Sequence, residues 1–533
     1  MKNPVPFLAS AAVASLMAQS AGAQQALDSF ASDLIVSSST YTDPGFAVGA
    51  ALPDSATGAG TAVASSAFCT NSTCSSNVWN NASVDGNFGI TSQILLQNIN
   101  TSSGHVDNSV NVSQLAAQQG INLVTSFPSK SELALNLTPD GTGITFMGYA
   151  ATAGQLDVSN ANTPGIIEPG NTDTATATFR EVGQISLASN ALSVTTTNAY
   201  NGNNGRAALL GSNGFYYMVG NAGNGNGGTA TTAATGVQLL TPGVNATAAT
   251  PGTTQVASYN ITQNGFAADK SAKDNNFRGE TVFNGVLYVS KGSGSNGIDT
   301  VYQVGPAGMT ASTTSPTATA SGQMTILPGF STTLAKATPT AANPVYHPFG
   351  LFFANATTLY VADEGSGSTN DFGTGTSATP FEAGGLQKWS LVNGSWTLDY
   401  TLRGSLIGSN YSVNGSGSLA GDSLGVTVDG LRNLTGEVDA NGTVKLFAVT
   451  STVGSALGDA GADPNQIVEI TDTLSATTAS QVAGENYTVL DTAALGQVYR
   501  GVALAPVPLP AAVWLLLSGL GGLGCLGRRR PAT

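Results

Sequence analysis

A serine between two glycines is the clearest candidate for nucleophilic chemistry in this 533-residue chain. Gly421-Asp422-Ser423-Leu424-Gly425 fits the pattern Gly-x-Ser-x-Gly, in which a strained strand-to-helix turn exposes a serine and a histidine removes its proton. The chain has only two histidines, His105 and His347, and 66 glycines, so the match is expected by chance. We therefore predict no catalytic residue, and we expect His347 to make a structural hydrogen bond at a strand entry.

Four arginines recur at the start of strand-like runs: Arg206, Arg278, Arg432 and Arg500. If those runs are the inner strands of a closed ring of sheets, the four guanidinium groups surround one mouth of its central channel. They would then bind an anion or a sugar carboxylate in bidentate fashion. The alternative is structural, with each arginine pairing with a carboxylate or a carbonyl of a neighbouring sheet. The many acidic residues in the same loops favour this second interpretation.

Acidic side chains gather in two Gly-rich loops, at Asp363, Glu364 and Asp371 and at Asp459 and Asp463. Oxygen-rich loops of this kind can hold Ca²⁺, although their spacing does not fit the helix-loop-helix calcium pattern. We predict no cofactor and no metal site, and Ca²⁺ stays as the alternative.

Cys69 and Cys74 lie close together in a stretch rich in Ser and Asn. A zinc site would need further ligands, and the surrounding sequence has neither a histidine nor a third cysteine. In an oxidising compartment these two residues are expected to form a small loop-closing disulfide.

The elements that would position these residues are short strands joined by tight turns. Residues 133–137 and 144–147 flank Pro139-Asp140-Gly141, a turn sequence in which proline presets φ and glycine accepts a positive φ. A similar unit recurs four times and begins a fifth, with openings at Ala207, Gly279, Gly350, Asn433 and Gly501. These openings are 72, 71, 83 and 68 residues apart, and no long helix-period segment separates them.

Repeated antiparallel sheets of this kind indicate an all-β fold, a β-propeller with large loop insertions. Openings at Phe88 and near Leu133, added to the five above, predict seven blades. The last inner strand, Gly501 to Leu504, has no partner after it, so we expect Leu34 to Val36 from the N-terminus to pair with it and close the ring. A β-solenoid or tandem β-sandwiches are the alternatives.

Both ends of the chain have the features of targeting signals. Lys2, the apolar run from Val5 to Met17 and the small residues Ala21-Gly22-Ala23 predict a signal peptide over residues 1–23. The formal charge of −14 becomes −18 without Lys2 and the three C-terminal arginines, so nucleic acid is not an expected partner. At the other end, we expect the uncharged apolar run from Val513 to Leu526 to form a transmembrane helix.

This C-terminal run stands between a proline motif and a basic cluster. The motif is Val507, Pro508, Leu509, Pro510 and Ala511, and the cluster is Arg528, Arg529 and Arg530. Arginines directly after a span mark the cytoplasmic side, which would leave the body outside the inner membrane. The three-part order resembles the PEP-CTERM class of bacterial sorting tails, in the variant whose motif reads Val-Pro-Leu-Pro-Ala.

That resemblance implies processing by an exosortase near Pro508–Pro510, transient anchoring in the inner membrane, and a Gram-negative host that makes exopolysaccharide. We therefore expect three parts: the signal peptide, a propeller body over residues 24–506, and a sorting signal over residues 507–533. The expected function is an exported cell-surface or extracellular-matrix protein, associated with biofilm or exopolysaccharide, with a binding or structural role. A secreted propeller enzyme acting on polysaccharide, a lyase or a hydrolase, is the alternative.

Overall fold

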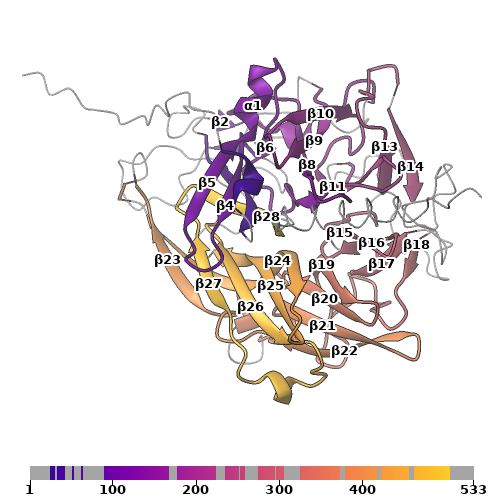
Figure 1. The fold of residues 1–533 in the computed structure, drawn as a ribbon, viewed down its shortest axis with the longest axis vertical. Helices are drawn as coiled ribbons and strands as arrows, with labels where there is room; N and C mark the ends of the chain where they lie inside the picture. Colours follow the sequence, from indigo (N-terminus) through magenta and orange to yellow (C-terminus); the bar gives the residue numbers. More distant parts are fainter. Residues whose placement is uncertain are drawn as a thin grey trace, which may run out of the picture.

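The computed structural model is a six-bladed β-propeller, built from six small antiparallel sheets around a central channel (Figure 1). It describes residues 25–30, 33–42, 51–52, 62–63, 89–166, 177–223, 235–250, 252–257, 274–294, 296–304, 324–372, 378–416, 420–421, 423–454 and 461–504. The predicted fold class is therefore confirmed.

Three consecutive blades follow the same plan, with the first strand innermost and the other three following outward. Blade II holds β11 (Gly205–Leu210), β12 (Tyr216–Gly220), β13 (Val237–Leu240) and β14 (Thr253–Ala257). Blade III holds β15 (Glu280–Phe283), β16 (Val286–Lys291), β17 (Thr300–Val304) and β18 (Met324–Ile326). Blade IV holds β19 (Pro348–Asn355), β20 (Thr358–Asp363), β21 (Gly385–Val392) and β22 (Ser395–Leu402).

Blades I and V vary this plan slightly. Blade I holds β7 (Asn136–Leu137), β8 (Gly143–Tyr149), β9 (Arg180–Ser186) and β10 (Leu192–Thr197), so its inner strand is short. Blade V holds β24 (Ser423–Val438), β25 (Thr443–Gly454), β26 (Gln466–Thr473) and β27 (Thr488–Thr492), and β23 (Asn410–Asn414) pairs with the first part of β24.

Blade VI joins the two ends of the described chain. Its inner strand is β28 (Gln497–Leu504), and its other strands are β1 (Leu34–Thr40), β4 (Thr91–Ile99) and β5 (Val106–Asn111). In the pairing of β1 with β28, Leu34 lies opposite Leu504 and Val36 lies opposite Val502. The predicted closure is therefore confirmed, with β1 between β28 and β4 in the sheet.

The blade count is six, and the prediction of seven was wrong. The run that begins at Phe88 was taken as the opening of a blade, but Thr91–Ile99 is β4, which pairs with β1 as the third strand of blade VI. Inner and third strands are both buried on two faces, so their hydrophobic runs look alike in sequence. β6 (Thr125–Ser126) and the short helix α1 (Val112–Gln118) belong to the connection from blade VI to blade I.

Turn residues account for the hairpins inside the blades. Between β7 and β8, the Asp140 carboxylate accepts hydrogen bonds from Thr138 Oγ1 (2.6 Å) and Thr142 N (3.1 Å), and Gly141 has a φ of 70°. Between β15 and β16, Asn284 and Gly285 have φ values of 49° and 75°, as a two-residue hairpin loop of type I′ requires. The predicted Pro-Asp-Gly and Asn-Gly turns are therefore present.

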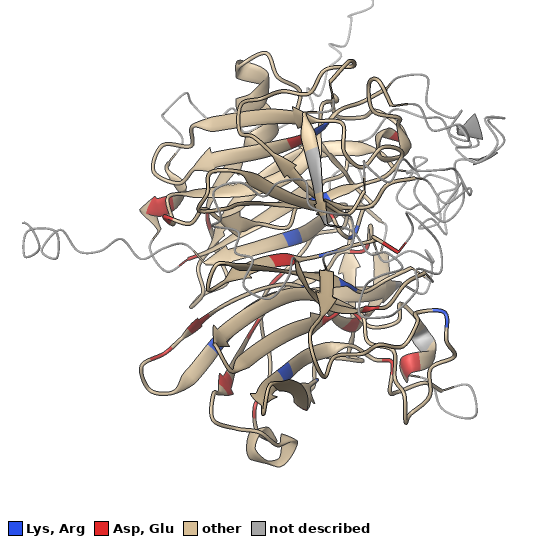
Figure 2. Cartoon of the chain, turned by 90° about the vertical axis from the view of Figure 1, so that its right-hand side faces the viewer, with Lys and Arg blue, Asp and Glu red and all other residues tan. Residues whose placement is uncertain are grey.

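The hydrophobic core is divided among the spaces between neighbouring sheets. The largest cluster extends across blades II to IV and includes Val219, Val289 and Trp389, and a second cluster fills the space between blades VI and I. Phe330 stacks on Trp389 with ring centroids 4.0 Å apart. Because each sheet is covered on both faces, charged residues are few, and Figure 2 shows them scattered over the ribbon.

Candidate functional site

Glycines at the strand entries let the inner strands of adjacent blades approach closely. A Cβ atom added to Gly279 would lie 2.2 Å from the Phe349 carbonyl oxygen, and one added to Gly501 would lie 2.3 Å from the Leu133 carbonyl oxygen. These contacts allow only a glycine, so the Arg-Gly pairs at 278–279 and 500–501 bring the inner strands into a narrow ring.

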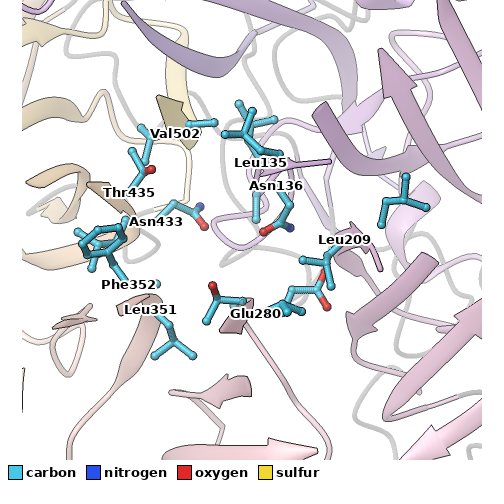
Figure 3. Close-up of a pocket in the computed structure, with 18 of the residues that line it drawn as sticks. Leu135, Asn136, Leu209, Glu280, Leu351, Phe352, Asn433, Thr435 and Val502 are labelled. Carbon is cyan, nitrogen blue, oxygen red and sulfur yellow. The ribbon is translucent and has the colours of Figure 1, made fainter. Parts of the chain in front are cut away.

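The ring encloses a central cavity of about 440 Å³. Every blade contributes to its wall, and representative lining residues from blades I to VI are Leu135, Leu209, Glu280, Leu351, Asn433 and Val502 (Figure 3). A volume of this order is in the range of small-ligand sites. We therefore take this cavity as the candidate functional site.

The polar side chains of the cavity wall come from blades I, II, III and V. Figure 3 shows the side-chain amides of Asn136 and Asn433 directed toward the opening, with the carboxyl group of Glu280 beside Leu209. Asn136 Nδ2 donates to the Ala208 carbonyl (3.1 Å) and Asn433 Nδ2 donates to the Arg500 carbonyl (2.8 Å), so both amides are held in place by the next blade. A fixed amide can offer its oxygen to a hydroxyl donor.

Glu280 contributes a buried carboxyl group to the cavity wall. It is 7% exposed, and neither of its oxygens has a hydrogen-bond partner among the described residues. Burial raises its pKa well above the usual value, because an isolated carboxylate is poorly solvated inside the protein. A protonated carboxyl group can donate as well as accept a hydrogen bond.

A cluster of charged residues adjoins the cavity at the strand entries, and Glu364 is at its centre. Glu364 Oε2 lies 3.2 Å from Arg432 Nε and 3.8 Å from Lys130 Nζ. Burial alone would raise the pKa of Glu364, but the positive charges of Lys130, Arg278 and Arg432 together lower it to about 2. Glu364 is therefore ionised and its charge is offset by several cations.

The structure brings three of the four predicted arginines into this cluster. Arg206 Nη1 donates to the Phe277 carbonyl (2.7 Å) of the next blade, and Arg278 lies over the Phe349 ring at 6.0 Å. Burial, and then the neighbouring charge of Arg278, lowers the pKa of Arg206 well below the usual value.

The fourth arginine makes other contacts. Arg500 Nη2 donates to the carbonyls of Phe127 (2.6 Å) and Gly461 (2.7 Å). All four arginines are at most 5% exposed, and each contacts an adjoining blade or the connections beside it. These are the kinds of contact that the structural interpretation requires.

The Gly-x-Ser-x-Gly segment does not form a strand-to-helix turn. Ser423 begins β24 and pairs with Asn414 of β23, and Asp422 lies outside the described residues. His347 Nδ1 donates to the Gly292 carbonyl (2.9 Å), which is the expected structural hydrogen bond at a strand entry. Neither residue therefore has the surroundings of a nucleophilic serine site.

In the acidic loop of blade IV, the carboxylates of Asp363 and Asp371 accept hydrogen bonds from protein groups. Asp363 accepts hydrogen bonds from Gly365 N (3.0 Å) and Gln387 Nε2 (2.7 Å), and Asp371 accepts from Ser366 Oγ (2.9 Å) and Thr379 Oγ1 (2.8 Å). In the part of the chain that the structure describes, no three His, Cys, Asp or Glu side chains converge as a metal site would need. Of the second acidic loop, Asp463 is among the residues that the structure describes, and Asp459 lies outside them.

Several predicted features lie outside the described residues. These are the signal peptide, Cys69 and Cys74, and the sorting signal from Val507 to Arg530. Over the residues that are described, none of the helices has the length and apolarity to span a bilayer.

Sequence reasoning missed the polar residues of the cavity wall. Asn136 and Asn433 lie near the positions at which the sequence repeat predicts inner strands to begin. Asparagine is common throughout this chain, so these two residues did not differ from the others in any way that indicated a site. Glu280 could have been predicted. If the run Glu280-Thr281-Val282-Phe283 is an inner strand, its charged residue must be buried, and buried charged residues are rare.

Comparisons with known proteins add distant structural likenesses. No family model matches the chain, and no curated protein matches it. Many solved structures can be aligned to it, and three of them are as follows. An oxidoreductase from Thermus thermophilus, described as a glucose dehydrogenase, is 14% identical over 60% of this chain and 90% of its own, with a TM-score of 0.28. A protein from Bacteroides fragilis, described as a 6-phosphogluconolactonase, is 10% identical over 89% and 98%, with a TM-score of 0.30. A protein from Bacteroides thetaiotaomicron, described as a glycosidase, is 9% identical over 63% and 86%, with a TM-score of 0.29.

Proposed function

We propose that this chain is an exported propeller of the cell surface or extracellular matrix that binds a neutral part of an exopolysaccharide in its central cavity. The observation that carries the proposal is the cavity wall. Its polar groups are amides, hydroxyls and one buried carboxyl group, set among aliphatic side chains of all six blades. Such groups exchange hydrogen bonds with sugar hydroxyls, and the aliphatic side chains contact the ring carbons.

The charge of the chain supports a neutral ligand. With a formal charge of −14 the chain repels polyanions at a distance. The cations beside the cavity are largely engaged with Glu364 and with backbone carbonyls. The order of the proline motif, the apolar run and the arginines at the C-terminus supports an extracytoplasmic location.

Binding and turnover can be measured in one experiment with the purified body and exopolysaccharide from its native host. We expect saturable binding without new reducing ends or unsaturated products. Asn433→Ala should weaken binding, since it removes an amide from the wall. The matched control is Asn441→Ala, which changes an exposed asparagine at the tip of the hairpin between β24 and β25 of the same blade.

A polysaccharide lyase or hydrolase is the second candidate, and Glu280 is the observation that favours it. A buried, protonated carboxyl group can act as a general acid. A glycoside hydrolase also needs a second carboxylate at a fixed separation, whereas Glu280 is the one carboxyl group among the described residues that line the cavity. Product formation that is lost in Glu280→Gln would establish this candidate and overturn the binding role.

The proposed sorting has its own test. If an exosortase processes the chain, mature protein from the native host should end within or before Val507–Ala511. Mass analysis of the mature protein measures this directly. Retention of Val513–Arg530 on every molecule would mean that the tail is a plain membrane anchor.

A further inference from the structure

A lysine and an aspartate from different blades meet in the interior, away from the central cavity. Lys388 lies on β21 of blade IV and Asp472 on β26 of blade V, 84 residues apart in sequence. Lys388 Nζ and Asp472 Oδ2 are 2.8 Å apart. Each residue lies on the third strand of its blade, counted from the inner strand. The pair is therefore a contact between blades IV and V.

The surroundings of this pair exclude water. Lys388 is 1% exposed and Asp472 is fully buried. Lys388 Nζ lies 5.6 Å from the ring centroid of Tyr360 and 5.4 Å from that of Tyr400. The hydroxyl of Tyr400 donates to Asp472 Oδ1 (2.7 Å), and the hydroxyl of Tyr360 donates to Oδ2. The ammonium and the carboxylate are therefore held in contact by protein groups in a site of low polarity.

A second carboxyl group completes the cluster. Glu485 follows the short helix η7 (Ala479–Val482), and its Oε1 is held by Thr473 N and Thr473 Oγ1, both at 3.0 Å. Burial, and then a hydrogen bond to Asp472, raises the pKa of Glu485 to about 7. Two carboxyl groups in such contact share a proton, so Glu485 can both donate and accept one.

From this geometry we propose that Lys388 and Asp472 form an intramolecular isopeptide bond, an amide between Nζ and Cγ that covalently joins blades IV and V, with Glu485 as the proton carrier.

The reaction balances without an oxidant or a cofactor. In the proposed step one ammonium proton passes from Nζ to Asp472 Oδ2, and the lone pair that this leaves on Nζ attacks Cγ. Tyr400 donates to Oδ1 and stabilises the negative charge that develops there. Glu485 accepts a proton from Nζ and delivers one to Oδ2. The Cγ–Oδ2 bond then breaks, one water molecule leaves, and a secondary amide remains.

Another buried lysine–aspartate pair serves as an internal comparison. Lys291 and Asp299 of blade III are in direct contact and are at most 3% exposed. The charged groups that act on Asp299 are Lys291, His347 and Arg278, all of them basic. With no carboxyl group in the role of Glu485, this pair is expected to stay an ion pair.

The test is mass analysis of the folded full chain, with and without denaturant. We expect the mass of the isolated species to be one water molecule below the mass that its sequence gives. Trypsin does not cleave after an acylated lysine, so digestion should yield residues 337–403 joined to residues 446–500. Glu485→Gln should fold, keep the contact and lose the link. Glu469→Gln, a change on the same strand as Asp472, should keep it.

Three results would overturn the proposal. The first is a folded wild-type chain with no loss of water and no joined peptide. The second is a link that maps to Lys291 and Asp299. The third is a link that persists undiminished in Glu485→Gln. Peptide mapping of the wild-type chain decides the existence of the bond even if a variant fails to fold.

Discussion

The hydroxyl oxygen of Ser37 lies 2.7 Å from the carbonyl oxygen of Leu133, and this contact joins the closing blade to blade I. The same hydroxyl accepts a hydrogen bond from Gly501 N (2.7 Å). Ser290 repeats the arrangement between blades III and IV, where it donates to the Phe349 carbonyl (2.5 Å) and accepts from Gly279 N (3.0 Å). The closure formed by the two chain ends is thus built like a joint between two continuous blades.

Removal of the N-terminal strand should destabilise the whole propeller. Deleting residues 28–41 leaves β28 without its partner β1 and separates it from β4, so backbone groups of an inner strand lose their hydrogen bonds. The free energy of unfolding should fall by an amount comparable with the ~5–15 kcal/mol of a typical domain.

Thermal unfolding of the deleted and full bodies measures this effect. A deletion within Thr310–Ser321, which the sequence predicts to be a loop, is the control and should change the midpoint little. An unchanged midpoint after loss of residues 28–41 would contradict the role of the closure.

A methyl group at Gly279 should loosen the joint between blades III and IV. The added Cβ would lie 2.2 Å from the Phe349 carbonyl oxygen, which is backbone and cannot turn aside. We expect Gly279→Ala to cost roughly 1–3 kcal/mol, as overpacking does elsewhere. Denaturant unfolding measures the cost, and Gly484→Ala, which has open space around it, is the control. Equal stabilities of the two variants would show that the close approach is unimportant.

Glu364 should make the stability of the fold sensitive to acid. Its pKa is lowered to about 2 in the folded chain, against about 4.3 when unfolded, so the folded state binds its proton less readily. The stabilisation, up to ~3 kcal/mol, is present above about pH 4 and is lost as the pH falls toward 2.

Unfolding measured between pH 2 and pH 6 tests this dependence. Glu364→Gln should be less stable than the wild type at pH 6, because Arg432 and Lys130 lose their counter-charge. The difference should shrink toward pH 2. A difference that does not change with pH would contradict the assigned ionisation.

Glu181 should make the fold less stable as the pH rises, which is the opposite of the effect of Glu364. Burial raises its pKa to about 8, so the folded chain keeps a proton that the unfolded chain releases near pH 4.3. Stability contributed by this residue therefore falls as the pH rises from about 4 to 8. Glu181→Gln should lose less stability between pH 5 and pH 8.5 than the wild type does, as measured by denaturant unfolding. A steeper loss in the variant would show that Glu181 is ionised in the folded state.

The periodicity of the sequence predicted most of the blade strands because the signals are local. Asn284-Gly285 and Pro139-Asp140-Gly141 determine their own turns through backbone preferences, and strands flanking them follow from the apolar runs. The role of each strand is not local. The run at Thr91–Ile99 was assigned to a blade of its own, although β1 pairs with it in blade VI.

The cavity wall was harder to predict than the strands. Asn433 and Glu280 are separated by more than 150 residues, and no pattern within either segment indicates that both line one cavity. The four arginines were predicted at the starts of inner strands; Arg206 and Arg278 lie near the starts of β11 and β15, whereas Arg432 and Arg500 lie inside β24 and β28. Their partners, such as Glu364 for Arg432, could not be predicted because the pairing depends on which loops lie side by side.

By itself, the sequence of this protein determined an all-β chain of repeated hairpins whose two ends complete one sheet, since the strand pattern and the missing partner of Gly501–Leu504 were both visible in it. Only the tertiary structure decided the number of blades, the wall of the central cavity and the meeting of Lys388 with Asp472. The physical reason is distance along the chain. Turns and strands are set by neighbouring residues, whereas a cavity or a buried pair depends on the angle at which distant sheets pack around the ring.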